Sequence, residues 1–107
     1  MEFNNVSIAK EANILYDGKI TSRTITFEDG TKKTLGIMLP GEYELNTVNK
    51  STIDINLGVV EVMLPAEDWV QYVAPASIKI AQNSKYKLRV ISLVDYCCSF
   101  EKVKYKK

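Results

Sequence analysis

Apolar and polar residues alternate at a spacing of two along most of the chain, whereas apolar residues at helical spacing are nearly absent. The clearest case is the run Ile53-Asp54-Ile55-Asn56-Leu57, in which every second residue is apolar. Residues 20–27 alternate in the same way and are rich in β-branched side chains. Because successive side chains of a strand point to opposite faces of a sheet, this alternation predicts strands with one buried face.

Turn residues separate the alternating stretches. Asp29-Gly30 predicts a tight hairpin between two strands, and Pro40-Gly41 predicts the next turn. The predicted strands cover 20–27, 32–39, 42–47, 53–57, 60–64, 69–73, 78–81, 86–94 and 96–100, with a short strand within 13–16. Roughly eight to ten short strands, spaced about ten residues apart, predict an all-β sandwich or barrel, and so many strands in a short chain favour a small jelly-roll barrel.

Length and composition fit one domain spanning 1–107, because 107 residues with 46% hydrophobic side chains can build one core. The net charge is +1, from 14 basic and 13 acidic residues, so no global field would steer nucleic acid or a membrane surface. The basic excess is local, in residues 102–107, which we expect to form a flexible, solvated tail rather than a nucleic-acid site.

The compartment predicted from the sequence is the cytoplasm. The first residues lack the basic and apolar stretches of a secretory signal, and no apolar run reaches the length of a membrane span. Cys97 and Cys98 are the two cysteines, and neighbouring strand residues face opposite sides, so we expect both to be reduced thiols.

The absence of histidine limits the chemistry. Without imidazole, the chain has no histidine base, proton shuttle or metal ligand. Two adjacent cysteines alone do not make a zinc site, and the glycines match neither a phosphate-binding loop nor a dinucleotide fingerprint. We therefore expect a protein without a metal or organic cofactor, which uses carboxylates, lysines, hydroxyl groups and backbone dipoles.

Several polar and aromatic residues near turns are candidates for a site. Glu42 directly follows Gly41, where its carboxylate could bind the hydroxyl groups of a ligand, act as an acid or simply be solvated. Tyr43 and Tyr86 could stack on a flat ring or pack in the core. Among the remaining candidates, Lys32 and Lys33 are adjacent on a hairpin arm, so one faces inward and one outward, and the sequence alone does not say which.

Four stretches together resemble one family. They are Tyr16-Asp17-Gly18-Lys19-Ile20-Thr21-Ser22-Arg23-Thr24, the turn Phe27-Glu28-Asp29-Gly30, the run from Lys32-Lys33-Thr34-Leu35-Gly36 through Ile37-Met38-Leu39-Pro40-Gly41-Glu42-Tyr43, and Asp95-Tyr96-Cys97-Cys98. The chain is similar over nearly its whole length, most densely over 12–47, to the pyrimidine/purine nucleoside phosphorylases, a family of small bacterial cupin-fold proteins.

The resemblance implies a cupin-type β-barrel, usually a homodimer, that cleaves purine and pyrimidine nucleosides with inorganic phosphate to a free base and ribose 1-phosphate. It implies no metal, with phosphate as co-substrate. Cleavage of this kind needs an anion site, groups that hold the ribose and a donor for the departing base. Our hypothesis assigns phosphate to Lys32 or Lys33 with Thr47, ribose and catalysis to Glu42 beside Gly41, and the base to Tyr43 or Tyr86.

Two other functions stay open at this point. A catalytically weak cupin that binds a nucleoside or sugar phosphate as a sensor or binding module is favoured by Ser51, where the family tends to have glutamate. An interaction protein that acts only through its dimer would bind no ligand. The intact run 36–43 favours the enzyme.

Overall fold

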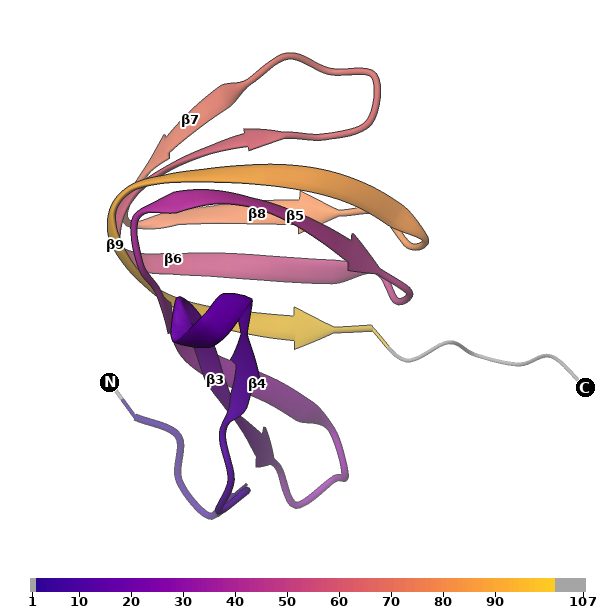
Figure 1. The fold of residues 1–107 in the computed structure, drawn as a ribbon. Helices are drawn as coiled ribbons and strands as arrows, with labels where there is room; N and C mark the ends of the chain where they lie inside the picture. The colour runs from indigo at the N-terminus through magenta and orange to yellow at the C-terminus, as the bar shows by residue number, and fades with distance from the viewer. Residues whose placement is uncertain (1, 102–107) are drawn as a thin grey trace, which may run out of the picture.

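Two long strands, β6 (Ser51–Met63) and β9 (Ser84–Phe100), pair antiparallel along their length and organise the fold. The computed structural model describes residues 2–101. The pairing register of the two strands shifts between Ile55 and Val60, around Gly58, and both strands bend there. As a result, the two halves of the β6–β9 ribbon belong to two different layers (Figure 1).

The remaining strands extend these two layers. In the first layer, the N-terminal half of β6 and the C-terminal half of β9 are flanked by β8 (Ala76–Ile80), β4 (Lys32–Met38) and β3 (Ile20–Thr26), with β1 (Ser7–Ile8) and β2 (Asn13–Leu15) along β3. In the second layer, the other halves are flanked by β5 (Gly41–Thr47) and β7 (Val70–Val73). A short 3-10 turn, η1 (Tyr16–Gly18), connects β2 to β3.

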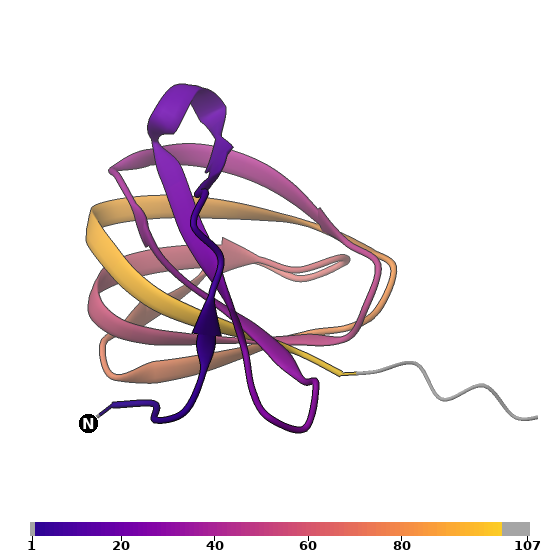
Figure 2. The ribbon, with the colours of Figure 1, turned by 90° about the horizontal axis from the view of Figure 1, so that it is seen from below.

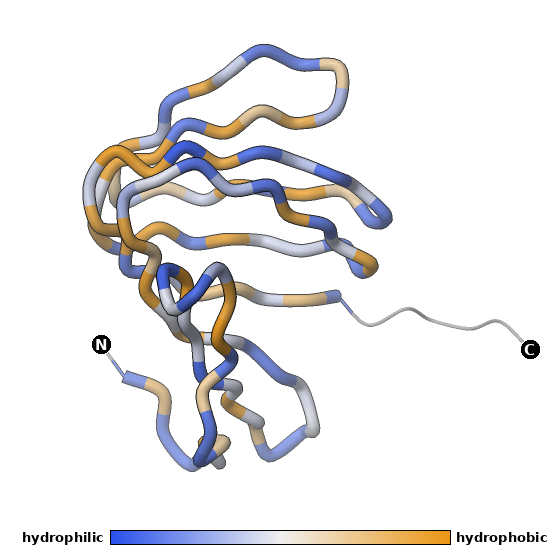
Figure 3. Tube along the Cα trace, viewed as in Figure 1, coloured by the Kyte–Doolittle hydropathy of each residue, from blue (hydrophilic) through white to orange (hydrophobic). Residues whose placement is uncertain are grey.

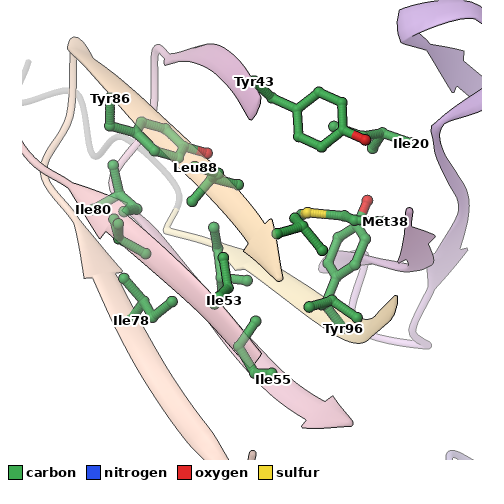
Figure 4. Packing of buried hydrophobic residues seen from close by; sticks show 14 residues of the cluster. Ile20, Met38, Tyr43, Ile53, Ile55, Ile78, Ile80, Tyr86, Leu88 and Tyr96 are labelled. Atoms are coloured by element: carbon green, nitrogen blue, oxygen red, sulfur yellow. The ribbon is translucent and has the colours of Figure 1, made fainter. Parts of the chain in front are cut away.

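Apolar and polar residues alternate along the strands (Figure 3), and the core lies between the layers because the apolar residues of each layer face the other. From β6, Ile53 and Ile55 come from the first layer, and Val60 and Val62 from the second. Figure 4 shows Tyr43, Met38 and Tyr96 at one end of the cluster and Tyr86 at the other. The buried cluster is Ile20, Met38, Tyr43, Ile53, Ile55, Val60, Val62, Ile78, Ile80, Tyr86, Leu88, Val90, Val94 and Tyr96. Burial of these side chains supplies the main driving force for folding.

The β3–β4 hairpin runs beyond the stacked part of the layers. Figure 1 shows it pointing away from the other strands, and Figure 2 shows the same hairpin after a quarter turn. Its turn is closed as the sequence predicts: the Asp29 carboxylate accepts hydrogen bonds from the backbone N–H and the hydroxyl group of Thr31. The hairpin therefore has two different faces: one continues the core-facing side of the first layer, and the other continues its outer side.

The predicted all-β fold is confirmed, with two corrections to the strand count. The stretches 53–57 and 60–64 form one strand, β6, because Gly58 takes a φ of +101° and bends the chain without ending its pairing. Likewise, 86–94 and 96–100 form one strand, β9. The sequence did not predict β1 or the turn η1. The expected tail at 102–107 lies outside the described residues.

Candidate functional site

A row of hydroxyl groups lines the side of the β3–β4 hairpin that continues the inner, core-facing side of the first layer. Ile20 on β3 and Met38 on β4 are paired and buried in the core. Every second residue counted from Ile20 and Met38 lies on that same side of the hairpin. On the hairpin these positions carry mostly polar side chains instead of apolar ones. We call this the hydroxyl face, and it consists of Ser22, Thr24 and Thr26 on β3 and Thr34 on β4, all half-buried.

Tyr96 joins the hydroxyl face to the core. It pairs with Gly36, which pairs with Ser22, so these residues form one row across β9, β4 and β3. Burial raises the pKa of Tyr96, and its hydrogen bond with Ser22 opposes that rise. The Asn13 side-chain amide donates to Ser22 Oγ at 3.2 Å and to Thr24 Oγ1 at 3.3 Å. A connected set of hydroxyl and amide groups thus lies beside the core.

Glycine at position 36 makes room for this arrangement. A Cβ atom there would stand 2.9 Å from the Tyr96 hydroxyl oxygen, 2.8 Å from Ser22 Cβ and 2.0 Å from the Thr21 carbonyl oxygen. Each distance is below van der Waals contact, so any side chain at position 36 would push β3 and Tyr96 away. The absent side chain lets the tyrosine reach Ser22.

The structure separates the two adjacent lysines. Lys32 pairs with Thr26 and stands an even number of residues from Met38, so it lies on the side of the hydroxyl face and is exposed. Lys33 lies on the opposite, outer side, where its ammonium group is 5.3 Å from the Phe3 ring centroid and 5.8 Å from that of Phe27. Of the two candidates for phosphate, only Lys32 shares a face with the hydroxyl groups.

Tyr43 and Tyr86 are core residues, 4% and 8% exposed. The Tyr43 hydroxyl group donates to the Leu39 carbonyl oxygen at 2.6 Å, and burial is the main cause that raises the pKa of Tyr86. Neither ring offers a free face on which a base could stack, so the stacking role expected for these residues has no support from the geometry. A ring that is exposed, Tyr16, lies 5.0 Å from Tyr43, centroid to centroid.

Gly41 and Thr47 lie at the two ends of β5, where each takes part in the structure of the adjoining turn. Gly41 takes a φ of +154°, and a Cβ atom there would stand 2.9 Å from the Tyr43 hydroxyl oxygen. The Thr47 hydroxyl group donates to the Asn49 carbonyl oxygen and lies 3.0 Å from Ser51 Oγ. Ser51 is buried and also donates to Asn49. Both hydroxyl groups therefore stabilise the β5–β6 turn, and a phosphate contact by Thr47 stays a prediction.

Glu42 lies on the outer side of the second layer, away from the hydroxyl face. Its Oε1 accepts from Arg89 Nε at 2.7 Å, and Arg89 also binds Glu61 Oε1 at 3.0 Å through Nη1. The guanidinium carbon stands 4.1 Å from the Trp69 ring centroid. Hydrogen bonds to the two carboxylates raise the pKa of Arg89. This arrangement across β5, β9 and β6 is a cross-strand ion-pair group on the surface.

A catalytic role for Glu42 stays a prediction, and this position does not favour it. We expect Glu42→Gln to keep kcat/KM for inosine and uridine within about threefold of the parent, because Glu42 lies away from the hydroxyl face. Its exposed ion pair with Arg89 also contributes little to the stability of the fold. Glu44→Gln, on the same side of β5, is the matched control. Steady-state kinetics of both variants decide the matter, and a hundredfold loss confined to Glu42→Gln would restore its catalytic role.

The outer side of the first layer carries a large hollow of about 1070 Å³. Its walls are mostly apolar and include Phe3, Ile8 and Leu35, and Lys33 also lines it. Cys97 faces this hollow, whereas Cys98 packs against the core, and burial raises the pKa of the Cys98 thiol to about 11. Both cysteines are free, as the sequence predicts.

Metal ligands are not gathered in one place in the part of the chain that the structure describes. Residues 2–101 contain no group of three or more Cys, Asp or Glu side chains that could hold an ion. The independence from metal expected from the sequence stays a prediction. The same span has no helix with the length and apolar character needed to cross a membrane.

Comparison with known proteins fixes the family. A model described as pyrimidine/purine nucleoside phosphorylase matches residues 10–100 of the chain. The chain belongs to this family. A protein of that name from Chlorobium chlorochromatii is 52% identical over 99 residues, which are 92% of this chain and 96% of the relative. Another, from Syntrophotalea carbinolica, is 48% identical and covers 94% of this chain and 98% of its own length.

Solved structures confirm the cupin-type jelly-roll fold. A protein of unknown function from Acinetobacter sp. ADP1 has a TM-score of 0.89 at 31% identity, covering 94% of this chain and 98% of its own. The cupin domain of Schizosaccharomyces pombe Cnp3 has a TM-score of 0.62 at 14% identity, covering 83% of this chain and 69% of that one. The second likeness concerns the fold alone. Unlike a full barrel, the sheet here stays open along one side.

Proposed function

We propose that this protein cleaves purine and pyrimidine nucleosides with inorganic phosphate, giving a free base and ribose 1-phosphate. Membership of the family supports the reaction, and the position of Lys32 supports its place in the structure. The ammonium group of Lys32 lies on the same face as the hydroxyl groups of Ser22, Thr24 and Thr34, and in our proposal together they bind phosphate and the ribose hydroxyl groups. A lysine ammonium group and hydroxyl donors are groups that bind phosphate in proteins.

The hydroxyl face would act mainly by holding the reactants in position. Phosphorolysis passes through an oxocarbenium-like sugar, so phosphate must stand on one side of the anomeric carbon while the base leaves from the other. In our proposal, Lys32 with Thr26 and Thr34 binds phosphate. Ser22 and Thr24, oriented by the Asn13 amide, hydrogen-bond the ribose hydroxyl groups.

Tyr16 replaces the two core tyrosines as the ring that holds the base. Its ring is exposed and packs at one edge against Tyr43, and its hydroxyl group donates to the Glu44 carbonyl oxygen. Tyr16 and Asp17 have positive φ angles of 50° and 55°, a conformation that non-glycine residues adopt at a cost. Stacking on one face would accept purines and pyrimidines alike, because every base has a flat π-surface.

The direct test is the incubation of pure protein with inosine or uridine, with and without phosphate. We expect release of free base and ribose 1-phosphate in equal amounts, only when phosphate is present, and an unchanged rate after exhaustive chelation. If the protein binds either nucleoside without cleaving it, the proposed enzyme activity is wrong and the protein is a binding module. A loss of activity that added metal restores would overturn the metal-free mechanism alone.

The assembly we propose is a homodimer, in a cytoplasmic protein. The support is the family resemblance together with the apolar side chains that the monomer leaves exposed on the first layer. Light scattering over a range of concentrations should give a mass near twice the 12.1 kDa of one chain. A constant mass of one chain would contradict the dimer and would leave the proposed reaction untouched.

A further inference from the structure

The outer side of the first layer, turned away from the core, carries apolar side chains that residues 2–101 leave exposed. Leu35 and Ile37 on β4 are 38% and 36% exposed, and Ile8 on β1 is 62% exposed. The large hollow and a smaller one next to it share Ile8, Ile25 and Leu35 as walls. The two hollows thus form one apolar depression across β1, β3 and β4, which we call the outer face.

Four charged residues on the strands of the outer face are sorted by side. Arg23 on β3 and Lys33 on β4 lie on one half, and Asp95 on β9 and Asp54 on β6 lie on the other. The ladder runs Arg23–Leu35–Cys97–Asp54, because these residues are paired neighbours across four strands. A basic end, an apolar middle and an acidic end therefore follow one another in a single row.

Two further observations define the limits of this pattern. Among the described residues, two depart from it: Lys79, on β8 at the far edge of the acidic half, is basic, and Glu2, which lines the large hollow together with Phe3 and Lys33, is acidic. Arg23 Nη1 donates to the Lys10 carbonyl oxygen at 2.8 Å, and Ser77 Oγ donates to Asp54 Oδ1, so both charged groups are held in position from their own chain. Positioned charges lose less entropy when they pair with a partner.

We propose that the outer face binds the outer face of a second copy of this chain, around a two-fold axis parallel to the strands between β4 and β9. That operation places β3 of each copy over β6 of the other. Arg23 of each copy then opposes Asp54 of the other, so this charge pair forms twice, and the apolar middle rows meet. A surface that complements itself under a two-fold rotation is what an isologous dimer needs.

The chemistry of the surface favours a second copy over a small ligand. An apolar centre with charged groups at its rim has the anatomy of a protein interface. Leu35 and Ile37 line the depression on each copy, and in the pairing they lie over β9 of the other copy. The hydroxyl face lies on the opposite side of the same layer, so the dimer leaves it open to substrate.

This inference rests on the proposed homodimer and adds the surface through which it forms. The experiment uses two variants of the full chain, each reversing the charges of one half of the face: R23E/K33E and D54K/D95K. Each variant alone brings like charges together at both ends, so we expect its dimer dissociation constant to rise at least about a hundredfold. Mixed one to one, the two variants should form heterodimers as tightly as the parent, since every contact is again between opposite charges.

Sedimentation velocity of each variant and of the mixture gives the masses, and thermal melts show that each variant is folded. K85E/K87E, which makes the same charge change on the outer side of the second layer, is the matched control and should stay dimeric. Dimers of R23E/K33E as stable as the parent would overturn the proposed surface, and so would a mixture that stays monomeric. A monomeric parent would overturn the homodimer itself, whereas the phosphorolysis assay reports separately on the reaction.

Discussion

Lys32→Met is expected to lower kcat/KM for phosphate about a hundredfold while the melting temperature changes little. The substitution keeps most of the length of the side chain and removes its charge. Loss of one preorganised charge from an anion site typically costs about 3 kcal/mol of transition-state stabilisation, which is a factor of about a hundred in rate. Lys32 is exposed at the end of β4, so little packing depends on it.

Lys33→Met is the matched control, because it is the next residue along the same strand and faces the other way. We expect kcat/KM for phosphate within about threefold of the parent at concentrations where the dimer is intact. Initial rates at varied phosphate and saturating uridine measure both variants. The opposite outcome, with Lys33 essential and Lys32 dispensable, would move the phosphate site to the outer side of the first layer.

The sequence predicts best where a structural signal is local. The Asp29-Gly30 turn and the paired strands on either side of it follow directly from turn residues and alternation. Gly58 misleads for the same reason: a glycine between two alternating stretches is typical of a turn, but here it bends one continuous strand. Only the pairing of β6 with β9, residues far apart in the chain, distinguishes the two cases.

The candidate site shows what alternation could have added. Glu42 and Tyr43 are neighbours on one strand, so both could not face the same ligand, and the buried tyrosine fixes the carboxylate outside. By the same rule, counting back from apolar Met38 places Lys32 on the inner side. The sequence could not reveal that Tyr43 and Tyr86 are wholly buried, because burial depends on how the second layer packs against the first.

The hydroxyl face was not among the sequence-based candidates, although its signal is present. Ser22, Thr24 and Thr26 occupy every second position of β3, where a core-facing strand would carry apolar residues. Polar residues at intended core positions indicate that the strand leaves the core there. What alternation alone does not provide is Tyr96, which comes from the other end of the chain and meets Ser22 through β4.

Gly58→Ala is expected to destabilise the protein by at least about 3 kcal/mol, because it acts on the bend that turns one sheet into two layers. The φ of +101° is costly for any residue with a side chain, typically by about 1–2 kcal/mol. A Cβ atom there would also stand 2.2 Å from the Leu93 carbonyl oxygen and 3.1 Å from that of Ser92, both backbone atoms of β9. Neither strand can move without breaking the ladder between β6 and β9.

Gly30→Ala separates the backbone strain of a positive φ from the steric clash of the added Cβ atom. Gly30 has a similar φ of +84°, but nothing lies within 4 Å of the position of its Cβ, so that variant carries the backbone strain alone. We expect it to lose about 1 kcal/mol, and urea unfolding of both variants measures the difference. Equal losses would mean that the β6–β9 bend yields easily. In that case the angle between the layer that carries the hydroxyl face and the layer that carries Tyr43 would not be fixed by Gly58.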